Sequence, residues 1–193
     1  MIPVGAEKVL PRALIGDADS VIPDALRGVL AAACEEIQAL SERIKITERQ
    51  IEAVAEQTPL VALLRSIPGI GLLTATALVA FVGEIQRFPS GRHFASYLGL
   101  TPREYSSGLR RRLGRISKRG DSYLRMLLIH GARSVLCHAK QTDDHDRLRT
   151  WALGLEKRIG HNKAAVALAN KLARIAWAVW KHGRSFESLS QAA

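Results

Sequence analysis

The sequence contains little cysteine and no long hydrophobic run, and each shortage excludes a class of protein. Cys34 and Cys137 are the only cysteines among 193 residues. A disulfide framework is therefore excluded, and two reduced thiols in a cytoplasmic protein are expected. No apolar stretch is long enough to cross a bilayer, and the first residues lack the charged and apolar regions of a signal peptide. We predict neither secretion nor insertion into a membrane.

Aromatic residues are also scarce, and this shortage, together with abundant alanine and leucine, favours helices. Phe, Trp and Tyr make up 5% of the chain, and apolar residues make up 47%, an ordinary share for a folded domain. We predict an all-α protein with a long N-terminal coiled-coil helix and a compact helical domain. The predicted divisions are an irregular lead-in at 1–23, a coiled-coil arm at 24–58, the helical domain at 59–186 and a tail at 187–193.

Acidic residues are few in the second half of the chain. Residues 1–100 contain nine Lys and Arg against eleven Asp and Glu, whereas residues 101–193 contain nineteen against seven. The run from Arg110 to Arg119 contains six bases and no acid. A generally basic, soluble surface is the alternative, but it does not require such a run. A nucleic acid that docks on the C-terminal half is therefore the favoured partner.

An apolar repeat with alternating steps of four and three residues runs from Asp24 to Gln57. This spacing is the heptad repeat of a coiled-coil seam. Pro23 favours a helix start, and Pro59 ends the helix. The repeat favours a homodimer or higher oligomer, and an ordinary amphipathic helix packed on its own domain is the alternative. The seam consists of Leu26, Leu30, Ala33, Ile37, Leu40, Ile44, Thr47, Ile51 and Val54.

Two apolar helices are predicted on either side of a turn that contains Gly69 and Gly71. The order of helix, glycine turn and helix matches a helix-hairpin-helix, in which backbone N–H groups approach a phosphate of a nucleic-acid backbone. A tight helical hairpin with only a structural role fits the same sequence, and Arg65 is the sole base nearby. Both interpretations stay open at this point.

Three further helices are predicted after the basic stretch, one over 122–139 and two within 147–183. Lys171 and Arg174 belong to the last helix, whose outer sides form a basic surface. Helical spacing of tryptophans is typical of core or interface residues, and we predict this for Trp151, Trp177 and Trp180.

The segment from Gln141 to Arg147 contains three Asp and one His side by side. These side chains could hold a divalent metal ion, but four consecutive residues face different directions and no distant ligand presents itself. A solvated loop followed by a helix start is favoured. We predict no metal ligand in this chain.

A Ser-Ser-Gly turn lies beside the densest positive charge. The glycine after Ser107 permits an exposed turn, and nearby arginines could stabilise phosphate charge, so the Ser107 hydroxyl could attack a phosphodiester. Most Ser-Ser-Gly sequences are only turns, and no local His or Asp is an evident base for Ser107. The cations predicted to hold phosphates are Arg110, Arg111, Arg112, Arg115, Lys118 and Arg119, with Arg103 and Arg125 as further candidates.

Together these motifs resemble the C-terminal transposase domain of the insertion sequence 110 family, in its insertion sequence 1111 branch. The similarity covers about 63–186 and is carried by residues 68–71, 99–103, 106–108, 114–120 with 124–125, and 169–174. The resemblance implies that Ser107 is the nucleophile of DNA strand exchange and that a structured RNA guides the reaction. It also implies an N-terminal RNase-H-like domain that binds Mg²⁺ through four acids, and no region of this sequence matches that domain.

The resemblance therefore predicts a DNA- and RNA-binding component of a transposase, with no cofactor site in this chain and little recombination by the chain alone. The alternative is a non-catalytic DNA- or RNA-binding dimer derived from a truncated transposase.

Overall fold

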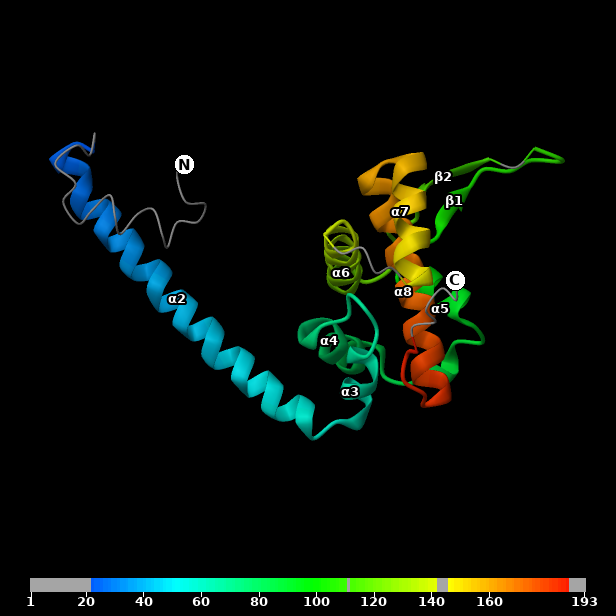
Figure 1. Ribbon diagram of the computed structural model, residues 1–193, viewed down its shortest axis with the longest axis horizontal. Helices are drawn as coiled ribbons and strands as arrows, with labels where there is room; N and C mark the ends of the chain where they lie inside the picture. The colour runs from blue at the N-terminus through cyan, green and yellow to red at the C-terminus, as the bar shows by residue number, and fades with distance from the viewer. Residues whose placement is uncertain (1–21, 111, 142–145, 188–193) are drawn as a thin grey trace. The chain divides into compact units, whose positions relative to one another are not determined.

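A computed structural model of the protein describes residues 22–110, 112–141 and 146–187. Helices account for most of these residues and their only sheet has two strands, which confirms the predicted all-α class. No helix in these ranges is long and apolar enough to span a membrane. The elements (Figure 1) are α2 (Asp24–Glu56), α3 (Pro59–Arg65), α4 (Leu72–Val82), the 3₁₀ turn η1 (Ile85–Arg87), α5 (Gly91–Tyr97), β1 (Pro102–Glu104), β2 (Leu113–Ile116), α6 (Ser122–Ala139), α7 (Arg147–Ile159) and α8 (His161–His182).

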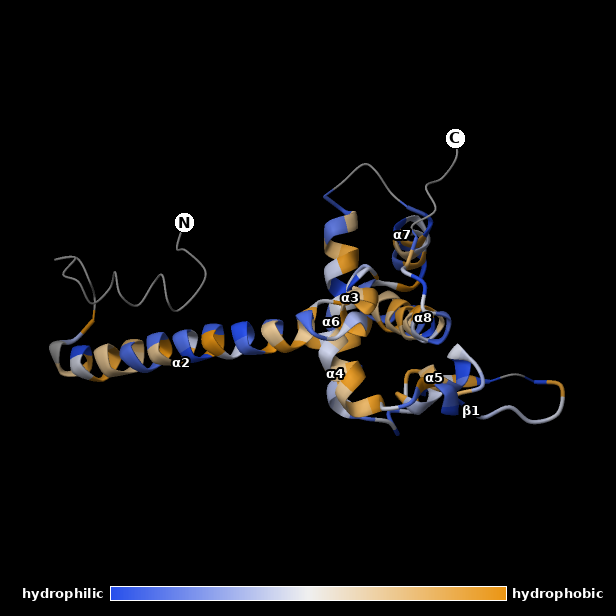
Figure 2. Ribbon diagram, turned by 90° about the horizontal axis from the view of Figure 1, so that it is seen from below, coloured by the Kyte–Doolittle hydropathy of each residue, from blue (hydrophilic) through white to orange (hydrophobic). Residues whose placement is uncertain are grey.

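The chain divides into two units between Glu52 and Ala53. As far as it is described, the first unit consists almost wholly of α2, whose 33 residues extend by a few residues into the second unit. Apolar and polar residues alternate along this helix (Figure 2). Leu26, Leu40 and Ile44 of the predicted seam are exposed. The helix therefore lies where the heptad repeat predicts it, and its assembly into a coiled coil stays a prediction.

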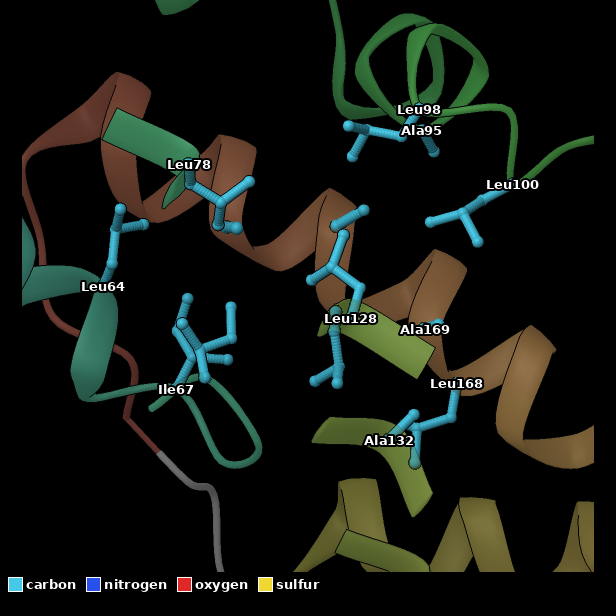
Figure 3. Close-up of a cluster of buried hydrophobic side chains, with 14 of the residues drawn as sticks. Leu64, Ile67, Leu78, Ala95, Leu98, Leu100, Leu128, Ala132, Leu168 and Ala169 are labelled. Carbon is cyan, nitrogen blue, oxygen red and sulfur yellow. The ribbon is translucent and has the colours of Figure 1, made fainter. Parts of the chain in front are cut away.

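Helix α8 is the centre of the second unit, because it packs against α3, α5, α6 and α7. Its buried face consists mainly of alanines, with Leu168, Leu172 and Val179 between them. Leu98 of the α5 end and Leu128 of α6 point toward this face (Figure 3), and both are fully buried. Each such leucine contributes about 1.5–3 kcal/mol relative to an exposed position. The small alanines let the neighbouring helices approach α8 closely.

The turn between α3 and α4 packs directly on α6. Gly69 has a φ of 82°, a conformation that glycine adopts without steric cost. A Cβ atom on Gly131 would overlap the Gly69 carbonyl oxygen, and a Cβ atom on Gly69 would lie 2.7 Å from the Gly131 carbonyl oxygen. Two glycines therefore let the two backbones touch, which fixes the turn on the core.

The basic stretch after α5 differs from the prediction. The sequence predicts a turn and no strand there, whereas β1 and β2 pair with each other. Their described residues are almost all exposed. Neither strand therefore needs a buried apolar face, and the sequence lacks the alternation of apolar and polar residues that predicts a half-buried strand. The pairing arises from a tight turn and from backbone hydrogen bonds at the base, both described below.

Aspartates cap two of the helices in this unit. Asp121 Oδ1 accepts a hydrogen bond from the Leu124 backbone N at 2.8 Å, and Asp146 Oδ1 accepts one from the Arg149 backbone N at 2.7 Å. Such caps satisfy backbone donors that have no partner within the helix. Asp146 thus marks the helix start predicted in the acidic segment, and residues 143–145 of that segment lie outside the described ranges.

Candidate nucleic-acid interface

Strands β1 and β2 form an antiparallel ribbon that projects from the helices of its unit (Figure 1). Pro102 pairs with Ile116, and Glu104 pairs with Leu113. Two residues of β2 therefore oppose Arg103 alone, which is the arrangement of a β-bulge. Every described ribbon residue from Pro102 to Arg115 is exposed, and Ile116 is partly buried. Both faces of the ribbon are consequently accessible to a partner.

The tip of the ribbon is a two-residue turn. Ser107 and Arg110 exchange backbone hydrogen bonds, with N to O distances of 3.3 and 3.2 Å. Gly108, the first central residue, has a φ of 55°, and a tight hairpin turn of this kind favours glycine at that position. Leu109 follows and is fully exposed. The turn therefore holds Ser107 at the outer end of the ribbon.

The two neighbouring serines differ in what their hydroxyls bind. Ser106 Oγ donates a hydrogen bond to Glu104 Oε1 at 2.7 Å and accepts one from the Arg112 backbone N at 3.0 Å. Ser107 is exposed, and no hydrogen bond joins its hydroxyl to another described residue. Ser106 therefore stabilises the ribbon, whereas the Ser107 hydroxyl is accessible to an external group.

Most cations that the sequence assigns to phosphate binding lie on this ribbon or directly after it. Arg111 is outside the described residues. Among the described residues from Pro102 to Gly120, Glu104 is the only acid. Arg103 also donates a hydrogen bond from Nη2 to the Ser117 carbonyl oxygen at 3.3 Å. A dense group of like charges on one projecting element is typical of an anion-binding surface. The exposed members are Arg103, Arg110, Arg112, Arg115, Lys118 and Arg119.

The base of the ribbon is joined to the helices by backbone contacts. The Lys118 backbone N donates to the Gly99 carbonyl oxygen at 3.1 Å, and a Cβ atom on Gly99 would lie 2.8 Å from the backbone N of Gly120. Arg125 Nη1 donates to the carbonyl oxygens of Leu98 and Gly120 at 3.2 and 3.0 Å. Arg125 was a phosphate-binding candidate, and these contacts give it a role in positioning the ribbon.

The two glycines of the predicted helix-hairpin-helix have different surroundings. Gly69 packs against Gly131, so protein fills the space beside it. Gly71 is exposed at the N-terminus of α4, and nothing lies within 4 Å of a Cβ atom built on it. Gly69 therefore has a structural role whether or not the turn binds a phosphate, and phosphate binding at Gly71 stays a prediction.

Lys171 and Arg174 belong to a different surface, an open groove of about 1040 Å³ along α8. The Lys171 ammonium lies over the Trp151 ring, 4.1 Å from its centroid. Burial lowers the pKa of Lys171, and the charge of Arg174 lowers that pKa further. Trp151 is 38% exposed. Trp151 is therefore not a core residue. The interface position, the other part of the prediction from helical spacing, stays a prediction.

The groove was not predicted, although one signal for it was present. Lys163, Lys171 and Arg174 are separated by eight and three residues, which places them on one face of a helix. The other walls come from α5, the ribbon base and α7, and only the folded chain brings these segments together.

The described part of the ribbon presents Ser107, the candidate nucleophile, without an evident base or metal site. No described His, Asp or Glu side chain is hydrogen-bonded to Ser107. Within the described ranges, no three His, Cys, Asp or Glu side chains gather in a way that could hold a metal ion. These residues therefore do not fit a Mg²⁺ ion, and we assign no step below to a metal.

Comparison with known proteins identifies a related group. Residues 61–147 match the model of the transposase IS116/IS110/IS902 family. A probable family 20 transposase of Pseudomonas aeruginosa is 46% identical over 159 residues, which cover 82% of this chain and 46% of the relative. The transposase for insertion sequence element IS1111A of Coxiella burnetii is 42% identical over 170 residues, covering 88% of this chain and 46% of the relative.

A third relative is the transposase for insertion sequence element IS1328 of Yersinia enterocolitica, which is 40% identical over 147 residues, or 76% of this chain and 43% of the relative. The chain thus spans about half the length of the relatives that it matches. The matched range begins in α3 and ends at the start of α7, so it includes the Gly69 turn, the whole ribbon and α6. Residues 61–147 of this chain are therefore similar to the domain that the transposase IS116/IS110/IS902 family shares.

Proposed function

We propose that this chain is a nucleic-acid-binding part of an insertion-sequence transposase and that it takes part in DNA transposition by serine-mediated, RNA-guided strand exchange. One observation carries the proposal: the hydroxyl of Ser107 has no hydrogen bond to a described residue and lies at the tip of a basic ribbon. The names of the related transposases support the same function.

The shape of the ribbon fits duplex DNA. The major groove of B-form DNA is wide enough to admit a two-stranded β-ribbon. Exposed arginines on β1 and β2 can then contact phosphates on both sides of that groove, which fixes orientation without reading the sequence. The cations near the tip, Arg110 and Arg112, are exposed and close in sequence to Ser107. A phosphodiester at the tip would therefore meet the hydroxyl and positive charge together.

The proposed chemical step is attack of Ser107 Oγ on a DNA phosphorus atom. A bond forms between Oγ and phosphorus, and the bond from phosphorus to one deoxyribose oxygen breaks. The serine proton passes to a base outside the described ribbon residues, and the released oxygen takes up a proton. Arginine N–H groups stabilise the charge on the phosphate oxygens in the transition state. Attack by a hydroxyl of another strand reverses the step and joins the new strands.

The remaining parts of the reaction are assigned to partners. We propose that a Mg²⁺-binding, RNase-H-like domain and a structured guide RNA complete the active site. The greater length of the related transposases leaves room for such a domain.

A covalent-adduct assay tests this proposal. The chain is incubated with element-end DNA, with and without a metal-binding domain and guide RNA, and the protein is then examined by denaturing electrophoresis. We expect a serine-linked adduct in the complete mixture, its loss in Ser107→Ala and its retention in Ser106→Ala, because of these two serines only Ser106 has a hydroxyl bound to other described residues. An adduct that persists in Ser107→Ala would refute the assigned nucleophile.

A second candidate function is a non-catalytic DNA- or RNA-binding protein, and the absence of a described base beside Ser107 favours it. The same assay separates the two candidates. Tight binding of DNA or RNA without an adduct in any mixture would support the binding-only function.

A further inference from the structure

The groove along α8 combines positive charge with apolar surface. It lies between α5, the base of the ribbon, α7 and α8 and has a volume of about 1040 Å³. None of the described residues that line it is acidic. Its cations come from two helices, Arg92 from α5 and Lys163, Lys171 and Arg174 from α8. Four positive charges without a counter-charge in the lining favour a polyanionic ligand.

The walls of the groove are held in place by contacts between distant segments. Asn170 Nδ2 donates a hydrogen bond to the Leu100 carbonyl oxygen at 3.1 Å, which joins α8 to the start of the ribbon. Trp177 Nε1 donates to the Phe88 carbonyl oxygen at 3.1 Å, which joins α8 to the segment before α5. A Cβ atom on Gly91 would lie 3.1 Å from the Arg174 Cα, so α5 touches the backbone of α8. The groove is therefore a built feature of the fold.

One wall of the groove pairs a cation with an aromatic ring. The Lys171 ammonium lies 4.1 Å from the centroid of the Trp151 ring, and 38% of the surface of Trp151 is exposed. Burial lowers the pKa of Lys171, so an anion beside it would restore stabilisation of the ammonium charge. Exposed aromatic rings and basic side chains are the two components with which proteins bind unpaired strands.

We propose that this groove binds an unpaired nucleic-acid strand, with phosphates at Lys171 and Arg174 and a base or sugar against Trp151 and the apolar lining. A projecting ribbon can enter the major groove of a DNA duplex. The concave protein groove cannot do so, but it can admit a single strand whose bases are unpaired. The inference rests on the proposed nucleic-acid function and adds a second site with a different substrate.

The position of the groove relative to the ribbon agrees with this assignment. Pro102 and Ile116 pair at the base of the ribbon and also line the groove. A strand that separates from a duplex held by the ribbon would therefore meet the groove first. Strand exchange requires such a separated strand, and the groove gives it a place beside the ribbon that carries Ser107.

The test measures the binding of labelled single strands and duplexes by fluorescence anisotropy over a range of salt concentrations. The probes are oligothymidylate and oligouridylate of about 16 nucleotides, a length that fills a typical single-strand site, and a DNA duplex of equal length. In the double variant Lys171→Gln/Arg174→Gln we expect single-strand affinity to fall about tenfold and the salt slope to fall by about 1.4. Trp151→Ala should lower that affinity at least about fivefold.

Duplex binding should stay unchanged in these variants, because the ribbon is intact. The matched control is Lys157→Gln/Lys181→Gln, which removes two exposed charges from α7 and α8 outside the groove and should leave single-strand binding unchanged. Thermal unfolding checks the fold of each variant, and Arg92→Gln provides a groove variant on another helix. The two probes distinguish a DNA strand from an RNA strand as the source.

The outcomes separate the two proposals. Normal single-strand binding by the groove variants, or an equal loss on single strand and duplex, would overturn the groove assignment alone. Failure of the wild-type chain to bind either probe or the duplex would overturn the proposed nucleic-acid function itself.

Discussion

Gly131 shows how one hydrogen atom in place of a side chain determines packing at the scale of a residue. It lies in the middle of α6, where glycine is disfavoured by about 1 kcal/mol relative to alanine. Alanine would not fit at this position, because the Gly69 carbonyl oxygen occupies the space that a Cβ atom would need. The contact positions the α3 to α4 turn, so a helix-weakening residue stabilises the tertiary structure.

We predict that Gly131→Ala lowers the free energy of unfolding by about 1–3 kcal/mol, because the new methyl group would overlap a backbone atom that cannot move alone. Urea denaturation followed by circular dichroism measures this change. Gly154→Ala is the matched control: Gly154 lies within α7, and nothing is within 4 Å of a Cβ atom there. The control should be stabilised by about 0.5–1 kcal/mol, and an equal effect of both substitutions would contradict the packing argument.

The serine pair illustrates a second point at the residue scale. Sequence motifs select Ser107 rather than Ser106, but the physical distinction between them is visible only in the folded ribbon. Glu104 and the Arg112 backbone engage Ser106, and no described residue engages the Ser107 hydroxyl. The candidate nucleophile is thus the serine that the ribbon does not need for its own stability.

At the scale of elements, Glu156 of α7 contacts residues at the end of α6 and at the start of α8. Its Oε1 accepts a hydrogen bond from Lys140 Nζ at 2.8 Å and lies 2.7 Å from His161 Nδ1. Lys140 follows α6 and His161 begins α8, so one carboxylate joins all three. The hydrogen bond from Lys140, and then that from His161, hold the pKa of Glu156 below its ordinary value of 4.5, although burial opposes them.

The lowered pKa of Glu156 leads to a pH-dependent prediction. A carboxyl whose pKa is lower in the folded state stabilises that state above its ordinary pKa, and this stabilisation is lost as the pH falls through the folded-state value. Glu156→Gln should therefore lower the free energy of unfolding by about 1 kcal/mol at neutral pH, and the difference from wild type should shrink as the pH falls below 4.5.

Denaturant unfolding at several pH values measures the effect of Glu156→Gln. Glu84→Gln, at an exposed position, is the control and should change little at any pH. A Glu156→Gln effect that stays constant from neutral to acid pH would show that the lost carboxylate charge is not its cause.

The ribbon and the groove are neighbouring candidate sites at the same scale. One is convex and the other concave, and both contain Pro102 and Ile116. Their shared base is fixed by the contacts of Lys118 and Arg125 with the preceding segment. A duplex on the ribbon and a strand in the groove would therefore be held at a defined separation.

At the scale of the whole molecule, the chain combines a basic helical unit with a helix whose predicted apolar seam is largely exposed. Residues from Ala53 onward have their own core around α8, whereas the described residues up to Glu52 belong almost wholly to one helix. We propose that α2 associates with the α2 helix of a second copy, because heptad seams are buried by partner helices.

Sedimentation analysis tests this association. We predict that the wild-type chain forms a dimer or higher oligomer and that Ile44→Glu, at a seam position that is 59% exposed, shifts it to a monomer by placing a charge in the seam. Gln38→Glu adds the same carboxylate at an exposed position off the seam and should leave the oligomer intact. A monomeric wild-type chain at high concentration would refute the predicted coiled coil.

The local part of the fold could be predicted well from the sequence. The helices over 122–139 and on either side of Gly160 lie where their periodicity predicts them, and α2 ends within two residues of the predicted end of the arm at 58. The dense cations and Ser107 were also identified from the sequence. These features depend on residues close together in the chain, and hydrophobic spacing and turn chemistry report such local preferences.

The tertiary structure decided the rest. It formed a ribbon from a stretch without apolar alternation, paired Gly69 with Gly131, and brought Leu100 to Asn170 to build the groove. These contacts join segments that are far apart in sequence, so neither spacing nor composition of one segment reveals them. Amino-acid order by itself determined which helices form and which half of the chain is basic, whereas long-range packing determined where those charges meet.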